Sequence, residues 1–169
     1  MRLLLSLLAC STVFAQPQSK LDDRWAPLAF LIGEWTGEGG GDPGQGSGGF
    51  SFLPDQHGTI LVRKNRADYP ATKDRPAYSH TDLMFVYRES GETQLRAIYF
   101  DTEDHVIHYA VEPSADGNSV QFVSTNYRLT YRKTGADWVA IKFEIAPADK
   151  PGAFATYIEA RARRTKPYF

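Results

Sequence analysis

Short segments in which apolar and polar residues alternate, separated by turn residues, make up most of this 169-residue sequence. Such segments are typical of half-buried β-strands, because successive side chains on a strand point to opposite faces. The clusters Asp116-Gly117-Asn118 and Thr134-Gly135 are examples of the turn chemistry between them. We therefore expect a first strand that starts on Trp35, followed by strands at 50–53, 59–67, 78–88, 94–101, 106–111, 119–124, 127–132, 138–146 and 155–163.

About ten regularly spaced strands predict an all-β fold, namely a single antiparallel up-and-down β-barrel. An open meander of this size has exposed edges, which closure into a barrel removes. Side chains just fill the interior of an eight-stranded barrel, and the diameter grows with the number of strands. A closed barrel of this kind is therefore expected to enclose a cavity that holds a small molecule.

The segment 28–39 (LAFLIGEWTGEG) predicts how the barrel begins. Asp22 and Asp23 suit the N-cap of a short helix, and Gly33 ends that helix just before the Trp35 strand. The indole of Trp35 is expected to close one end of the barrel together with the helix. The glycines two and four residues after it allow another backbone to approach closely.

The beginning of the chain predicts a signal peptide that is removed from the mature protein. Arg2 provides a positive charge, residues 3–8 are apolar, and residues 13–15 form a small-x-small cleavage site. The expected organisation is a signal peptide at 1–15, a disordered segment at 16–22 and one barrel domain at 23–169, exported to the periplasm or secreted. Residues 7–10 also resemble a lipoprotein cleavage site, so a lipid anchor on Cys10 is the alternative.

Charge and cysteine content argue against several partners. The 19 Lys and Arg residues balance the 20 Asp and Glu residues, which gives no indication of nucleic acid or a membrane surface as partner. The apolar run near the start is far shorter than the roughly 20 residues that span a bilayer, so no transmembrane segment is expected. Cys10 is the only cysteine, so a chain cleaved after Ala15 has no thiol for catalysis or metal binding. The oligomeric state is left open.

Alternation also predicts which side chains line the interior. In the strand at 138–146, Val139, Ile141 and Phe143 share an apolar face, whereas the face of His80 begins polar and ends apolar along its strand. We expect a lining that is apolar toward one end and polar toward the other, as suits an amphiphilic or hydrophobic molecule. The residues expected to bind it are Arg63, His80, Tyr99, His108, Tyr131, Tyr157 and Phe143, with Ile141 and either Met84 or Phe85 as further apolar walls. For any single strand, the alternative is that the polar face points to solvent.

The histidines predict neither a metal site nor catalysis. His105 and His108 are three residues apart on a strand, so their rings point to opposite faces and cannot hold one ion together. His80 and Asp82 share a face as a hydrogen-bonded pair or as two ligands, but a zinc site needs three or four. No strand–turn–helix motif presents a nucleophile. We therefore expect a non-enzymatic protein without a metal, with a hydrolase that depends on His80 or Asp82 as the remaining alternative.

Residues 28–41 (LAFLIGEWTGEGGG) and 157–164 (YIEARARR) resemble the first and last strands of the nitrobindin-like haem-binding barrels. The middle of the chain, including 62–76 and 95–111, looks more like exported bacterial relatives of these barrels. The resemblance implies a ligand-binding barrel that opens with a short helix.

The Gly33-x-Trp35 motif is also similar to that of lipocalins, which are calycin-type barrels. In lipocalins an arginine of the last strand covers this tryptophan. The similarity implies that Arg161 or Arg163 closes the barrel over Trp35 through a cation–π contact.

In nitrobindin-like barrels the residue that opens the last-strand motif is the histidine that binds the haem iron, and this chain has Tyr157 there. Tyrosine can bind ferric haem, so the resemblance implies Tyr157 as the iron ligand if haem is present. If the last strand keeps the family's facing, Tyr157, Glu159 and Arg161 point into the barrel, and the latter two form a buried pair. The main prediction is a barrel that binds a small, partly hydrophobic ligand without haem. The alternatives are a haem protein and a structural or envelope-interaction barrel with a filled core.

Overall fold

The computed structural model describes residues 21–38 and 46–168 of the chain. The predicted signal peptide, its cleavage site and Cys10 lie outside the described residues. The described elements are η1 (Asp23–Leu31), β1 (Gly33–Glu38), β2 (Ser47–Asp55), η2 (Gln56–Gly58), β3 (Ile60–Tyr69), β4 (Tyr78–Arg88), β5 (Leu95–Asp101), β6 (Val106–Pro113), β7 (Ser119–Val123), β8 (Tyr127–Gly135), β9 (Trp138–Ile145) and β10 (Ala155–Pro167). None of the helices in the described ranges has the length and apolar character needed to cross a bilayer.

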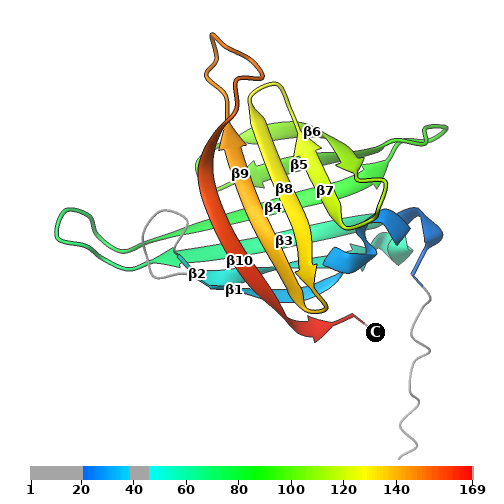
Figure 1. Cartoon of the computed structure of the whole chain (residues 1–169), viewed down its shortest axis with the longest axis horizontal. Coiled ribbons are helices and arrows are strands. Elements are labelled where there is room, and N and C mark those ends of the chain that lie inside the picture. Colours follow the sequence, from blue (N-terminus) through cyan, green and yellow to red (C-terminus); the bar gives the residue numbers. More distant parts are fainter. Residues whose placement is uncertain (1–20, 39–45, 169) are drawn as a thin grey trace, which may run out of the picture.

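The ten described strands form one closed antiparallel barrel, as predicted (Figure 1). Each strand pairs with its neighbours in sequence, and β1 pairs with β10 to complete the circle. Strand β2 begins at Ser47 rather than at the predicted residue 50, because the glycines that follow Ser47 pair with β3 although they carry no alternating pattern. Closure leaves no strand edge unpaired, which is the physical reason for expecting a barrel.

The 3₁₀ helix η1 covers one end of the barrel, next to η2 (Figure 1). Its N-cap is Asp22, whose side chain accepts a hydrogen bond from the Arg24 N–H. The buried indole of Trp25 donates to the Gly58 carbonyl at 2.8 Å, and the buried indole of Trp35 donates to the Leu31 carbonyl at 2.8 Å. Both indoles therefore bury their apolar area without leaving an N–H unpaired.

Aromatic side chains fill the barrel beneath η1. Trp35 stacks on Phe50 with ring centroids 5.8 Å apart. Phe52 lies edge-on to Tyr131 at 5.5 Å and stacks on Phe122 at 6.3 Å. All five side chains are buried, so this half of the barrel has a packed core. We call it the packed end.

Trp35 is buried under η1, and the arginine that covers it is Arg164 rather than the predicted Arg161 or Arg163. The Arg164 guanidinium lies 4.3 Å from the Trp35 ring centroid and donates to the carbonyls of Phe30 and Ile32. Arg163 is exposed on the outer face. The physical reason is register: Trp35 pairs directly with Arg164, and directly paired residues share a face of the sheet.

The predicted facing of the rest of β10 is also wrong. A bulge leaves Tyr157 unpaired, since Thr156 pairs with Glu144 and Ile158 pairs with Phe143. Because Phe143 faces the interior, Ile158 does so too, and the residues after it alternate from there. Glu159 and Arg161 consequently lie on the outer face, where their predicted buried pair does not form. The Glu159 side chain is 68% exposed, and Arg161 stacks on Trp138.

Candidate functional site

The half of the barrel away from η1 encloses a cavity of about 380 Å³. This volume lies within the range of small-molecule pockets, roughly 300 to 1,000 Å³. The lining is apolar along one side and polar along another. The sequence predicted a different division, with apolar residues toward one end of the barrel and polar residues toward the other. We call this half the hollow end. Its surfaces are a bare wall, an aromatic wall and a polar floor, which the following paragraphs define.

The bare wall consists of inward-facing positions that carry no side chain beyond Cβ. Gly37 pairs with Gly48, and Gly48 pairs with Ala67. These positions face inward because Trp35 and Phe50, two residues along the same strands, are buried in the core. Position 48 must be glycine, since its φ is +138° and a Cβ there would clash with the Arg66 carbonyl. Three neighbouring strands therefore present bare backbone to the cavity.

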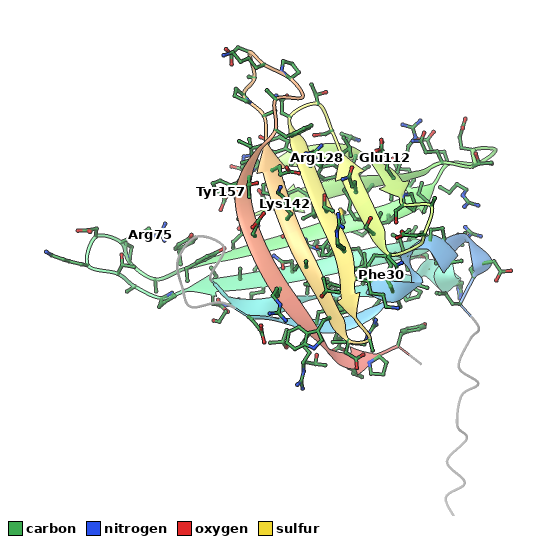
Figure 2. The ribbon with its side chains drawn as sticks, in the orientation of Figure 1. Phe30, Arg75, Glu112, Arg128, Lys142 and Tyr157 are labelled. Carbon is green, nitrogen blue, oxygen red and sulfur yellow. The ribbon has the colours of Figure 1, made fainter. Side chains whose placement is uncertain are left out.

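The aromatic wall comes from β8, β9 and the start of β10. The rings of Tyr127 and Phe143 are parallel, with centroids 6.0 Å apart, and the ring of Tyr157 lies edge-on to Phe143 at 6.2 Å. Leu129 and Ile141 extend this wall toward the packed end. Tyr157 is 59% exposed, so it forms the rim of the cavity rather than its interior. Figure 2 labels it beside β10.

The polar floor contains a buried ion pair between Arg63 and Asp82. Arg63 Nε also donates to the Tyr131 hydroxyl at 2.8 Å, and Asn65 Nδ2 donates to Asp82 Oδ2 at 2.8 Å. A buried pair of this kind is tolerated only when further hydrogen bonds satisfy both ions. Within the described residues, every buried side-chain nitrogen and oxygen has a hydrogen-bond partner. The floor is thus an internally satisfied network.

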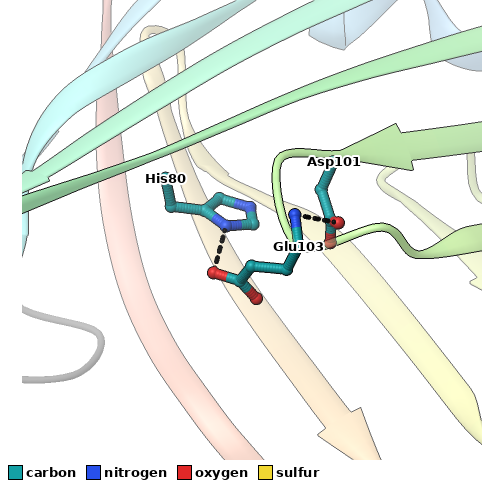
Figure 3. Close-up of side chains that lie close together, drawn as sticks. All are labelled: His80, Asp101 and Glu103. Atoms are coloured by element: carbon teal, nitrogen blue, oxygen red, sulfur yellow. Dashed lines mark hydrogen bonds and ion pairs between the residues drawn. The ribbon is translucent and has the colours of Figure 1, made fainter.

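His80 joins this network to the mouth of the cavity. Its Nε2 lies 3.3 Å from Asp82 Oδ2 and 3.2 Å from the Tyr99 hydroxyl, while its Nδ1 lies 3.1 Å from Glu103 Oε1 (Figure 3). The hydrogen bond with Asp82, assisted by that with Glu103, raises the pKa of His80 to about 9. At neutral pH the imidazole is therefore protonated and holds the two carboxylates together.

The turn after β5 places Glu103 beside His80. Asp101 shapes this turn by accepting the backbone N–H groups of Glu103 at 2.9 Å and His105 at 3.0 Å. Its other oxygen lies 2.9 Å from His105 Nδ1. Burial works against ionisation of Asp101, but the two backbone donors and the His105 side chain together outweigh it and lower the pKa of this carboxyl group.

His80, Asp101 and Glu103 also offer one possible metal-ligating atom each, all within 4.8 Å of one another. Sequence reasoning missed this trio because it compared only residues of one strand, His105 with His108 and His80 with Asp82. The trio combines β4, the end of β5 and the turn that follows it. In the structure His80 is paired at both nitrogens and protonated, and Asp101 is held by the turn. A divalent cation would have to displace the proton of His80 and break these contacts, so the arrangement is that of an ion-paired network.

Of the residues predicted to bind the ligand, Arg63, His80, Tyr99, Tyr131 and Phe143 come together around the cavity and its floor. Tyr157 reaches only the rim. His108 does not take part: it is exposed on the outer face of β6, and Ile107 and Tyr109 line the cavity from that strand.

The facing of β6 could not be read from the sequence, because its apolar residues fall on both faces. Of the two further apolar candidates, Met84 is buried in the core, while Phe85 packs on the outer-face ring of Phe100. Asn65 and Asp101, which face inward beside Asp82, were not among the predicted site residues. The glycines of the bare wall were not predicted as part of the site, because a residue without a side chain does not contribute to an alternating pattern.

No protein-family model matches this chain, and no curated protein matches it in sequence. The closed ten-stranded barrel is consistent with a calycin-like architecture.

Proposed function

We propose that this protein binds a small, partly hydrophobic molecule in the hollow end of its barrel and performs no chemistry on it. The observation that carries the proposal is the cavity of about 380 Å³ with an aromatic wall on one side and a polar floor at its base. Apolar atoms that line an empty space lose van der Waals contacts, which a ligand of matching shape restores. The floor gives the ligand's polar end a fixed place, and so an orientation.

The test is binding of a neutral fluorescent probe, N-phenyl-1-naphthylamine, combined with a variant that fills the cavity. A Cβ at Gly37 would lie 3.6 Å from its nearest neighbour, the Gly48 carbonyl oxygen, which is an ordinary contact. Gly37→Leu therefore keeps the backbone and projects a side chain into the cavity. Thr36→Leu is the matched control, because Thr36 is the exposed neighbour on the same strand.

We expect the probe to bind saturably to the unchanged protein and to Thr36→Leu, and binding to be lost in Gly37→Leu. Native mass spectrometry of the purified protein should also reveal a bound small molecule or an empty chain that accepts one. If neither the probe nor any co-purified molecule binds, or if Gly37→Leu binds as well as the control, the proposal is wrong.

The residues of the hollow end do not fit a haem group held through Tyr157. The Tyr157 side chain is mostly exposed at the rim, so an iron on its oxygen would lie outside the cavity. His80 offers no free nitrogen either, since both are paired and the ring is protonated. A Soret band on adding haemin that is lost in Tyr157→Phe, yet kept in His80→Ala and His108→Ala, would favour haem instead.

The proposal includes export and kinship with the nitrobindin-like barrels. The short helix before β1 supports this kinship. The arginine of the last strand over Trp35 is instead the feature shared with lipocalins, the other calycin-type barrels that the sequence resembles. For export, the mass of the mature protein is the test: a chain that begins at Gln16 supports cleavage after Ala15. A lipid-modified mass that disappears in Cys10→Ser supports the anchored alternative.

A further inference from the structure

We infer that the ligand is a flat aromatic molecule whose polar end donates hydrogen bonds and carries no negative charge. The inference rests on the proposed function, since it names the class of ligand for the same cavity. Two features carry it: the shape of the space between the walls and the sum of charges on the floor.

The shape of the cavity favours a flat ligand. In the closed order of strands, β1, β2 and β3 lie across the barrel from β6, β7 and β8. The first group presents the bare wall at Gly37, Gly48 and Ala67. The second presents Tyr127, which begins the aromatic wall, and the ring of Tyr109 on β6, which we count with that wall from here on. A planar ring can lie against backbone on one side and pack in offset or edge-on geometry against aromatic rings on the other.

A flexible alkyl chain would gain less from this arrangement. It loses rotational freedom when it is confined between the two walls, whereas a rigid aromatic ring has little to lose. The parallel pair of Tyr127 and Phe143, with an interplanar angle of 2°, also extends toward the mouth as an existing stack to which another ring can add.

The charges of the polar floor and of the mouth beside it disfavour an anionic ligand. Two cations, Arg63 and protonated His80, face three carboxylates, Asp82, Asp101 and Glu103. The sum of these five inward-facing charges is negative. Arg66 and Arg161 also border the cavity, but Arg66 is paired with Asp68 and Arg161 lies over the ring of Trp138 on the outer face. The two inward-facing cations are already paired with carboxylates, so a ligand carboxylate would have to compete with Asp82 or Glu103.

The same carboxylates favour a ligand whose polar end donates hydrogen bonds. Each carboxylate has about four lone-pair sites for acceptance. Asp82 and Glu103 use some of these for the partners described above, and Glu103 lies at the mouth with about half of its side chain exposed. A hydroxyl, amide or amine N–H at the end of the ligand can therefore bind here without displacing an existing partner.

Three matched probes test the inference: 2-naphthol, 2-naphthoate and 1-decanol, each titrated against the bound fluorescent probe at pH 7. We expect 2-naphthol to displace it at a concentration about tenfold lower than 2-naphthoate, because a like charge is disfavoured on the floor. We also expect 2-naphthol to bind more tightly than 1-decanol. Equal or tighter binding of 2-naphthoate or of 1-decanol would overturn the inference.

A charge variant sharpens the test. Glu103→Gln removes one carboxylate from the mouth of the cavity and should narrow the difference in affinity between 2-naphthol and 2-naphthoate. Glu112→Gln on the outer face of β6 should leave this difference unchanged (Figure 2). An unchanged difference in Glu103→Gln would contradict the charge argument. If 1-decanol displaces the fluorescent probe and 2-naphthol does not, ligand binding stands and the ligand class is wrong. If no compound binds at all, the proposed function fails with it.

Discussion

The two ends of this barrel are built from the same strands, yet one is packed and the other is hollow. At the packed end β1 and β2 contribute Trp35 and Phe50, whose rings stack at 5.8 Å. Two residues along the same strands, Gly37 and Gly48 contribute no side chain at all. The width of a barrel follows from its number of strands. Whether the interior is filled depends on what each row of inward-facing residues carries.

The two ends also satisfy their polar groups differently. At the packed end the indole N–H groups of Trp25 and Trp35 donate to backbone carbonyls, so the core contains neutral hydrogen bonds. At the hollow end, Arg63, Asp82 and His80 form a network of charges. The first arrangement favours a permanently closed core. The second keeps polar atoms next to a space where a ligand can bind.

The largest expected effect tests whether one end carries most of the packing energy. Phe52→Ala removes a fully buried ring that contacts Phe122 and Tyr131, and should lower the free energy of unfolding by about 3–5 kcal/mol. Phe143→Ala at the hollow end removes a half-buried ring beside existing space, and should cost only about 1–2 kcal/mol. Urea unfolding of both variants measures the difference. Equal losses would mean that the two ends are packed alike.

The next prediction concerns the charges of the polar floor. Asp82→Ala leaves the buried Arg63 without its carboxylate and should destabilise the protein by about 3 kcal/mol. Replacing both residues, with Arg63→Met and Asp82→Leu, should recover most of that loss, because no unpaired charge remains. A double variant as unstable as Asp82→Ala would show that the pair itself holds the hollow end together.

Closure at the packed end is expected to depend on one arginine. Arg164→Met removes the cation over Trp35 and the donors to the Phe30 and Ile32 carbonyls, at a cost of about 1–3 kcal/mol. Arg163→Met, on the exposed face of the same strand, should change stability by less than about 0.5 kcal/mol. Thermal and urea unfolding of the two variants compare them. A larger effect at Arg163 would restore the original expectation for that residue.

The smallest effect is a pH dependence confined to the hollow end. Asp82 and Glu103, with the Tyr99 hydroxyl beside them, surround His80 and raise its pKa from 6.5 to about 9. The folded protein therefore binds this proton more tightly than the unfolded chain does. The resulting stabilisation is complete below pH 6.5 and is lost as the pH rises to about 9.

For a half-buried group this amounts to on the order of 1 kcal/mol. His80→Gln should flatten the fall in stability over this pH range, and His108→Gln on the outer face should keep it. Urea midpoints measured at intervals from pH 6 to pH 9.5 provide the readout. An unchanged profile in His80→Gln would assign the dependence to another group.

Alternation within single strands predicted much of the site. The apolar face of β9 was clear from its own residues and brought Phe143 to the interior. On β3, β4, β5 and β8 the chosen candidates, such as Arg63 and His80, do face inward, although alternation left the opposite facing open. The approach did not work for β6, where apolar residues on both faces hid the orientation of His108. It also did not work for β10, where the bulge at Tyr157 reverses the alternation. A bulge depends on the partner strand, so a strand's own pattern does not reveal it.

The sequence by itself determined that this chain forms about ten antiparallel strands with a helix and Trp35 at one end, because alternation and turn residues are local properties. Only the tertiary structure decided which inward-facing side chains lie beside one another on neighbouring strands. Gly37 pairs with Gly48, and Arg164 pairs with Trp35, across strands that are adjacent in the barrel. The strands that carry Arg164 and Trp35 lie at opposite ends of the chain. Register between strands is a non-local property. The register between the strands therefore produced a packed core at one end of the barrel and a cavity for a ligand at the other.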